Sequence, residues 1–117
     1  MLIVDDDEDL RGSIRDYAES LGIDVWEAPS GVEALWILEE HRPALVLLDL
    51  NMPRLGGFET LNHLRAKHAS VRVVVVTGNP TDETRRRLAS LGVELLVKPL
   101  AVSALDSVFT AQERTAR

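Results

Sequence analysis

The chain has 117 residues, 19 of them Asp or Glu against 13 Lys or Arg, and ordinary globular fractions of hydrophobic (45%) and charged (27%) residues. At this length we expect one domain over residues 1–117, and the lack of cysteine excludes disulfide frameworks, thiolate zinc sites and cysteine nucleophiles. The apolar runs are far shorter than the roughly 20 residues of a membrane span, so we expect no membrane segment and no secretory leader, and we predict a cytoplasmic location.

The net charge of −6 is concentrated in one place, because residues 5–9 are five consecutive acids, Asp5-Asp6-Asp7-Glu8-Asp9. Removing these five from the 19 acids leaves 14 against 13 bases, so the rest of the chain is close to neutral. The acidic balance argues against direct binding of nucleic acid. The run itself has two explanations, favourable charge at a helix N-terminus or part of a functional site.

Short apolar runs alternate with amphipathic stretches five times along the chain. The runs are rich in Val, Ile and Leu, which is typical of parallel strands buried on both faces. The predicted strands are 2–4, 23–28, 44–48, 71–76 and 95–97.

Helical spacing of apolar residues and capping residues predict five helices between and after these strands. Gly22 and Gly92 stand where the first and fourth helices would end. The expected N-terminal caps of the second, fourth and fifth helices are Ser30, Thr81 and Ser103. Apolar residues over 58–64 mark the third helix.

Five strands alternating with five helices predict an α/β domain with a doubly wound, five-stranded parallel sheet and helices on both of its faces. In such sheets ligands bind outside the carboxyl ends of the strands, where the strand order reverses. Candidate functional residues are therefore the polar residues that directly follow the strands.

Four of the five predicted strands lead into such residues. Asp5 and Asp6 follow the first strand, Asp49 the third, Thr77 the fourth and Lys98 the fifth. If the first and third strands are neighbours, their acids face each other across one strand spacing, roughly 5 Å. Carboxylates so close repel one another unless a cation joins them, and hard oxygen ligands favour Mg²⁺ or Mn²⁺ over zinc.

A carboxylate held between a divalent cation and a lysine is suited to receive a phosphoryl group. The cation and Lys98 would neutralise the phosphoryl oxygens in the transition state, and the carboxylate would become an acyl phosphate. Thr77 would then donate a hydrogen bond to a phosphoryl oxygen that exists only after transfer. The residues at the strand ends thus predict phosphoryl transfer to a carboxylate.

Four motifs, in this order, resemble the receiver domain of bacterial two-component response regulators over essentially the whole chain. They are LIVDDD (2–7), LLDLNMP (47–53), VVTG (75–78) and VKP (97–99). The resemblance implies a flavodoxin-like (βα)5 fold with strand order 2-1-3-4-5. It also implies a signalling switch rather than a turnover enzyme, with a sensor histidine kinase or a phosphotransfer protein as its partner.

The resemblance implies a role for each residue of the site. Asp49 would accept the phosphoryl group from a phosphohistidine, Thr77 would be the switch hydroxyl, and Lys98 would pair with the phosphoryl group. The implied Mg²⁺ ligands are Asp6, Asp49 and the backbone carbonyl of Asn51, with Asp5 holding the metal through water. The family also has a cis peptide bond between the residues that match Lys98 and Pro99.

The chain departs from the family pattern at a signalling position. The family usually has Tyr or Phe three residues before the lysine, and this chain has Leu95. The aromatic half of the usual threonine–aromatic coupling is therefore missing, although the phosphorylation chemistry does not depend on it. Leu100, where the family prefers Phe, is a milder change.

Two other functions remain open alternatives. A small Mg²⁺-dependent phosphohydrolase with Asp49 as transient nucleophile would normally need a second acid two residues on, where Asn51 stands. A degenerate receiver that acts only as a docking module would not need the full set of acids, threonine and lysine.

Two surface features bear on partners. The family forms dimers and output contacts through the face of the fourth helix, fifth strand and fifth helix, so a homodimer through this face is an expectation. Residues 85–87 are three arginines on the fourth helix, and we favour a solvated helix face over a docking patch for them. We expect Trp36, on the second helix, to cover core surface rather than to contact a partner.

Overall fold

Strands and helices alternate strictly in the computed structural model, which describes residues 1–52 and 56–116, with side chains up to residue 111. The elements are β1 (Leu2–Val4), α1 (Glu8–Ser20), β2 (Trp26–Ala28), α2 (Gly31–His41), β3 (Leu45–Asp49), α3 (Gly57–Lys67), β4 (Arg72–Thr77), α4 (Asp82–Ser90), β5 (Glu94–Val97) and α5 (Val102–Ala116). The five predicted strands and five predicted helices are all present. No helix in the described part of the chain is long and apolar enough to cross a membrane.

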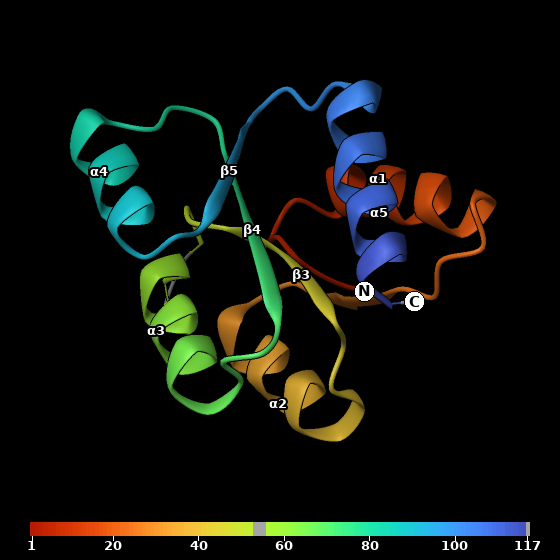
Figure 1. Cartoon of the computed structure of the whole chain (residues 1–117), viewed down its shortest axis with the longest axis horizontal. Coiled ribbons are helices and arrows are strands. Elements are labelled where there is room, and N and C mark those ends of the chain that lie inside the picture. Colours follow the sequence, from red (N-terminus) through yellow and green to blue (C-terminus); the bar gives the residue numbers. More distant parts are fainter. Residues whose placement is uncertain (53–55, 117) are drawn as a thin grey trace.

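The strands form one parallel sheet in the order β2-β1-β3-β4-β5. Helices cover both faces of this sheet, with α1 and α5 on one side and α2, α3 and α4 on the other (Figure 1). The predicted doubly wound α/β fold and its strand order are confirmed. The order reverses between β1 and β3, so the crevice expected at such a switch point lies at the carboxyl ends of these two strands.

Alternation along the strands divides the core between the two faces. In β1, Leu2 and Val4 pack toward α2 and α3, whereas Ile3 packs toward α1 and α5. The neighbouring β3 is buried along its whole length, from Leu45 to Asp49. Two apolar layers of this kind explain why the strands are nearly continuous runs of Val, Ile and Leu.

The third, fourth and fifth strands lie within one residue of their predicted bounds, and larger differences occur at two places. The second strand is shorter than 23–28 and begins at Trp26. Ser103 is not the cap of α5, because this helix begins at Val102 and the carbonyl of Ala101 accepts its first backbone hydrogen bonds, from Ala104 and Leu105. The helix therefore starts two residues earlier than the capping-box spacing predicts, ahead of its buried residues Leu105, Val108 and Phe109. The expected caps Ser30 and Thr81 are found, each accepting a backbone hydrogen bond three residues ahead.

The prediction for Trp36 is wrong. Its side chain is 64% exposed, and with Val32 (62% exposed) it lies on the outer side of α2. Ala34, Ile37 and Leu38 make the core contacts of this helix instead. Three apolar positions per two turns already bury α2, so Trp36 has no place left against the sheet.

We predict that Gly57→Ala destabilises the fold, because α3 begins in direct contact with the chain that follows β3. A Cβ at Gly57 would stand 2.3 Å from the Cα of Leu50 and 2.7 Å from the carbonyl oxygen of Asp49. Backbone atoms cannot yield as a flexible side chain can, so we expect a loss of about 2–3 kcal/mol in the free energy of unfolding. Urea unfolding would measure it. The matched control is Gly56→Ala, whose Cβ meets nothing within 4 Å, and an equal loss in both variants would contradict the prediction.

Candidate functional site

The acids of the first and third strands meet at the switch point. Because Val4 pairs with Leu48 in the parallel register, the next residues, Asp5 and Asp49, stand side by side. Asp5, Asp6 and Asp49 each offer a carboxylate oxygen, and the three oxygens lie within 4.8 Å of one another. The expected convergence of these acids is therefore found. Asp5 and Asp49 are buried, each 3% exposed, whereas Asp6 is exposed.

Lys98 lies opposite the acids at the end of β5. Its Nζ is 3.0 Å from Oδ2 of Asp5 and 3.7 Å from Oδ2 of Asp49. Burial lowers the pKa of Lys98, but the hydrogen bond to Asp5 and the charges of Asp49 and Asp5 outweigh burial and raise the pKa above its ordinary value. The lysine is therefore a fixed positive charge in this site. The Lys98–Pro99 peptide bond is cis.

The surroundings of Asp49 are unfavourable for a negative charge. Burial raises the pKa of its carboxyl, and the charges of Asp5 and Asp6 raise it further. The backbone N–H of Asn51, 3.1 Å from Oδ1, and the charge of Lys98 lower the pKa, but only in part. An added cation would lower it, because a cation compensates both burial and repulsion. Three carboxylates and no sulfur or imidazole suit Mg²⁺ or Mn²⁺.

The rest of the acidic run belongs to α1. Asp7 caps the helix, since its Oδ1 accepts a hydrogen bond from the N–H of Leu10 at 3.1 Å. Glu8 and Asp9 lie in the first turn, where acids interact favourably with the helix dipole. The backbone N–H of Asp7 also donates to Oδ1 of Asp5, at 2.9 Å. The helix start and the acidic site therefore share one short piece of chain.

Thr77 and Asn51 are joined in a way that the sequence did not predict. The Nδ2 of Asn51 donates to Oγ1 of Thr77 at 2.9 Å, and Thr77 is buried at the end of β4. The amide nitrogen of Asn51 is thus engaged with the threonine, and the backbone carbonyl of Asn51 stays a candidate metal ligand. The hydroxyl of Thr77 still has its own proton to donate.

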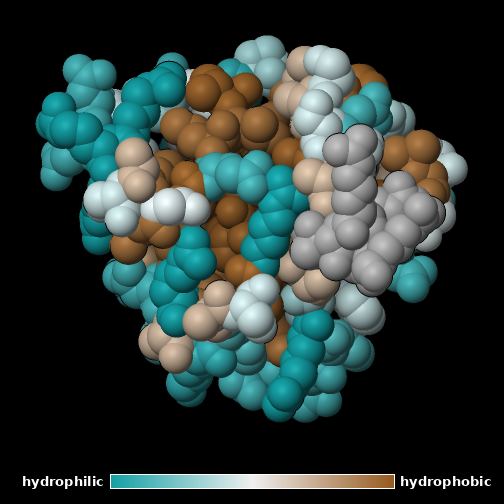
Figure 2. Space-filling view, in the orientation of Figure 1, coloured by the Kyte–Doolittle hydropathy of each residue, from teal (hydrophilic) through white to brown (hydrophobic). Residues whose placement is uncertain are grey.

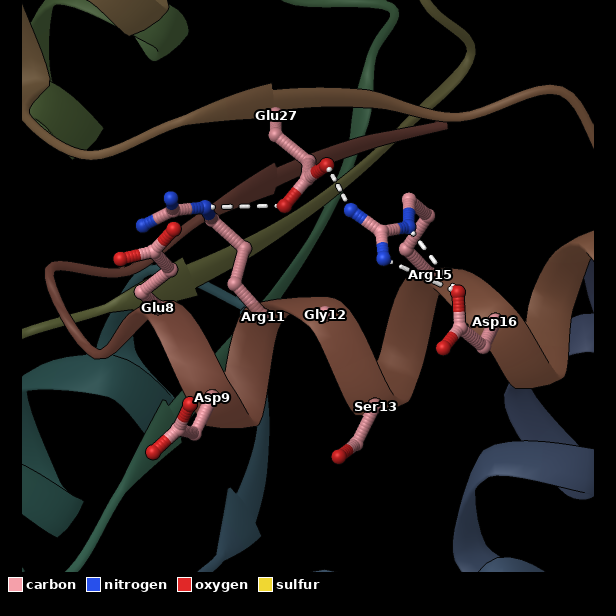
Figure 3. Close-up of a pocket in the computed structure, with 8 residues that line it drawn as sticks. All are labelled: Glu8, Asp9, Arg11, Gly12, Ser13, Arg15, Asp16 and Glu27. Carbon is pink, nitrogen blue, oxygen red and sulfur yellow. Dashed lines mark hydrogen bonds and ion pairs between the residues drawn. The ribbon is translucent and has the colours of Figure 1, made fainter.

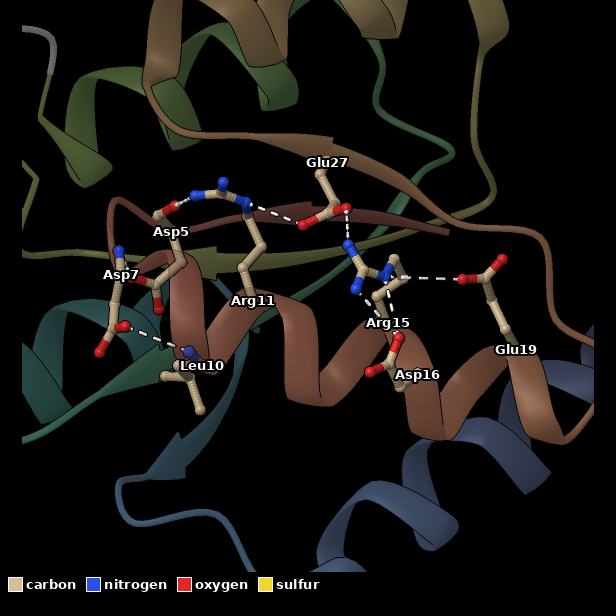
Figure 4. Close-up of polar contacts among 8 residues, drawn as sticks. All are labelled: Asp5, Asp7, Leu10, Arg11, Arg15, Asp16, Glu19 and Glu27. Carbon is tan, nitrogen blue, oxygen red and sulfur yellow. Dashed lines mark hydrogen bonds and ion pairs between the residues drawn. The ribbon is translucent and has the colours of Figure 1, made fainter.

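Arg11 is the residue of the site that sequence reasoning missed. Its Nη1 donates to the backbone carbonyl of Asp5 at 2.7 Å, and its Nε pairs with Glu27 at 3.0 Å (Figure 4). One signal for it exists in the sequence. A cation close to the N-terminus of a helix interacts unfavourably with the helix dipole. An arginine at this position therefore indicates a compensating interaction with a specific partner.

The fold and this arrangement of acids, lysine and threonine define a class of protein, the receiver domains. The chain matches the family model "Response regulator receiver domain" over residues 1–110. It therefore belongs to the response regulator receiver family, whose domains are signalling switches.

Curated relatives and solved structures agree with this assignment. The chain is 37% identical to response regulator MprA of Mycobacterium sp. (strain KMS) over 108 residues, which cover 90% of this chain and 46% of MprA. It is 37% identical to BvgA of Bordetella pertussis over 93 residues, which cover 79% of this chain and 44% of BvgA. The chain thus spans about half the length of the curated relatives that it matches.

Two solved structures show how close the fold is. The receiver domain of NtrX from Brucella abortus is 26% identical with a TM-score of 0.88, and the match covers 97% of this chain and 98% of that one. A response regulator receiver protein from Pseudomonas putida is 30% identical with a TM-score of 0.89, and the match covers 94% and 93%.

We predict that Asp49→Asn stabilises the metal-free protein at neutral pH. The pKa of Asp49 is raised in the folded state, so the folded protein loses stability as pH rises from the ordinary Asp pKa through the raised one. The neutral amide escapes this loss, so the gain should be full above the raised pKa and absent below the ordinary one. Urea unfolding in EDTA across this pH range would measure it.

The control for this prediction is Asp9→Asn, which removes an exposed charge from the first turn of α1. It should leave stability unchanged or slightly lower at neutral pH, by a few tenths of a kcal/mol. An Asp49→Asn variant less stable than the parent at neutral pH would contradict the prediction.

Proposed function

We propose that residues 1–117 form one receiver domain whose Asp49 accepts a phosphoryl group from the phosphohistidine of a sensor kinase or phosphotransfer protein, with Mg²⁺ (or Mn²⁺) bound. The observation that carries the proposal is the position of Asp49, buried among acids on one side and facing Lys98 on the other. The matches to response regulators support the same conclusion at the level of the family.

The reaction forms a bond between a carboxylate oxygen of Asp49 and phosphorus, and it breaks the bond between phosphorus and the imidazole nitrogen of the donor. The electron pair of the broken bond leaves with the imidazole. A bound Mg²⁺ would neutralise charge on the phosphoryl oxygens, and its proposed ligands are Asp6, Asp49 and the Asn51 carbonyl, with Asp5 acting through water. Lys98 supplies the second positive charge.

We propose that Thr77 reports phosphorylation. Its Oγ1 accepts from Asn51 while its proton stays available, so the hydroxyl can turn and donate to a phosphoryl oxygen on Asp49. Such a contact exists only after transfer and would favour one of two conformations. Leu95 is half-buried against the core beneath α2, α3 and α4. The change would therefore be transmitted through aliphatic packing of β5 and α4 instead of rotation of an aromatic ring.

The site argues against the two alternatives. A phosphohydrolase that used Asp49 as nucleophile would lack the second acid, because Asn51 occupies that position and its amide is bonded to Thr77. A degenerate receiver would have no use for the close set of three acids and a lysine. A switch that is phosphorylated and slowly dephosphorylates itself fits the residues best.

Partner surfaces follow from the exposed side chains. Apolar side chains gather on the visible face between α4 and α5 (Figure 2). Three large apolar residues of these elements are exposed, namely Leu91 directly after α4, Val97 at the end of β5 and Val102 at the start of α5. These exposed residues support a homodimer through the α4-β5-α5 face. We also propose that the domain acts in the cytoplasm and makes no direct contact with nucleic acid. Arg85, Arg86 and Arg87 are all exposed on α4, and the guanidinium carbon of Arg87 also lies 3.9 Å from the ring centroid of Phe58.

We predict that acetyl phosphate and Mg²⁺ add one acid-stable, base-labile phosphoryl group to the chain. The modification should be absent in Asp49→Asn and in EDTA, because the carboxylate is the acceptor and the cation neutralises the transferred group. Intact-protein mass spectrometry before and after mild base would measure it, with Asp9→Asn as a variant that remains modified. Modification that persists in Asp49→Asn would overturn the assignment, and steady turnover of a phosphoester would favour the phosphohydrolase.

A further inference from the structure

A polar hollow runs along α1 beside the edge strand β2, and two arginines of the helix cross it (Figure 3). Arg11 and Arg15, one turn apart, both reach the carboxylate of Glu27. The Nε of Arg11 is 3.0 Å from Oε1, and Nη1 of Arg15 is 2.9 Å from Oε2. Glu27 thus uses both oxygens to tie α1 to β2. Arg11 is the more buried arginine, with 12% of its side chain exposed against 39% for Arg15.

The second contacts of the two arginines differ, because Arg15 pairs with Asp16 and Glu19 on its own helix, whereas Arg11 reaches the acidic site. Its Nη1 donates to the backbone carbonyl of Asp5 at 2.7 Å (Figure 4). The N–H of Asp5 donates to the carbonyl of Ala28 at 3.1 Å. The two peptide groups that flank Asp5 are therefore both held from the side of β2, one by the strand and one by the arginine.

The carbonyl that Arg11 holds belongs to the peptide bond between Asp5 and Asp6. Asp5 has further restraints, because its carboxylate accepts from the N–H of Asp7 and from Lys98. The carboxylate of Asp6 is exposed, and no hydrogen bond or ion pair within the described residues holds it. The orientation of the Asp5–Asp6 peptide, whose carbonyl Arg11 holds, therefore bears directly on where this carboxylate can reach.

We propose that Arg11, itself fixed by Glu27, is a positioning residue that orients the Asp5–Asp6 peptide so that Asp6 and Asp5 face the divalent cation together. This inference rests on the metal site of the proposed function. Groups that hold metal ligands from behind raise affinity because the ligands are already arranged when the ion arrives. Without Arg11, part of the binding free energy would be spent on ordering this peptide.

The electrostatic effect of Arg11 has the opposite sign, which makes the inference testable. A positive charge near the acids repels a divalent cation, so removing it would strengthen metal binding if charge alone mattered. If Arg11 acts by position, Arg11→Gln weakens binding. Arg11→Lys keeps the charge but loses the planar fork that reaches Asp5 and Glu27 at once, so it weakens binding as well.

We would measure Mn²⁺ binding to the unphosphorylated protein, from the electron paramagnetic resonance signal of free Mn²⁺, with no phosphodonor present. We expect Arg11→Lys and Arg11→Gln to weaken binding about tenfold, and the matched control Arg15→Lys to change it less than about twofold. Arg15→Lys is the same substitution, on the same helix, against the same glutamate, without the contact to Asp5. Urea unfolding in EDTA would show how much stability each variant loses.

Each outcome separates the inference from the proposed function. A parent chain that binds no Mn²⁺ would overturn the metal site itself and, with it, the inference. A parent that binds Mn²⁺ while the Arg11 variants bind it as tightly as Arg15→Lys would overturn the inference alone. Should the Arg11 variants not fold, Glu27→Gln frees Arg11 without removing it, and we expect about threefold weaker binding. Unchanged affinity in Glu27→Gln would then count against the inference.

Discussion

The repulsion among Asp5, Asp6 and Asp49 is the interaction on which the rest of the structure depends. Two of these carboxylates are buried at the ends of neighbouring strands, and burial and mutual charge raise the pKa of Asp49. Lys98 offsets part of the cost from the end of β5, and its bond to Asp5 joins the two strands that lie on either side of β3 and β4. In the proposed function, a divalent cation would bind at this cluster and offset the repulsion before a phosphoryl group is transferred to Asp49.

The fold serves this charge cluster by its register. Parallel pairing of β1 with β3 fixes Asp5 beside Asp49, and pairing of β4 with β5 brings Thr77 and Lys98 to the same edge. The start of α3 lies directly against the end of β3, since a Cβ at Gly57 would stand 2.7 Å from the carbonyl oxygen of Asp49. The apolar layers on both faces of the sheet hold the strands, so the strand ends can keep several charged side chains close together.

The sequence predicted the strands and the acids, threonine and lysine that follow them, because burial and period-two packing leave one consistent register for parallel strands. It did not predict the bond between Asn51 and Thr77 or the reach of Arg11 to Asp5, since these depend on side-chain rotamers that only the packed fold selects. The predictions that Ser103 caps α5 and that Trp36 covers core surface were wrong for a related reason. Local capping spacing and hydrophobicity are weak preferences: α5 starts two residues earlier than the capping spacing predicts, and the core contacts of α2 leave Trp36 exposed.

The run of five acids contributes to two adjoining structures, the acidic site and the first turn of α1. Asp5 and Asp6 belong to the acidic site, whereas Asp7, Glu8 and Asp9 start α1. Asp7 belongs to both, because its side chain caps the helix while its N–H holds the carboxylate of Asp5. Arg11 connects the helix to the acidic site a second time, because its guanidinium donates to the backbone carbonyl of Asp5. A shift of α1 would therefore move the acids, and a change in the charge that the acids carry would be felt at the start of α1.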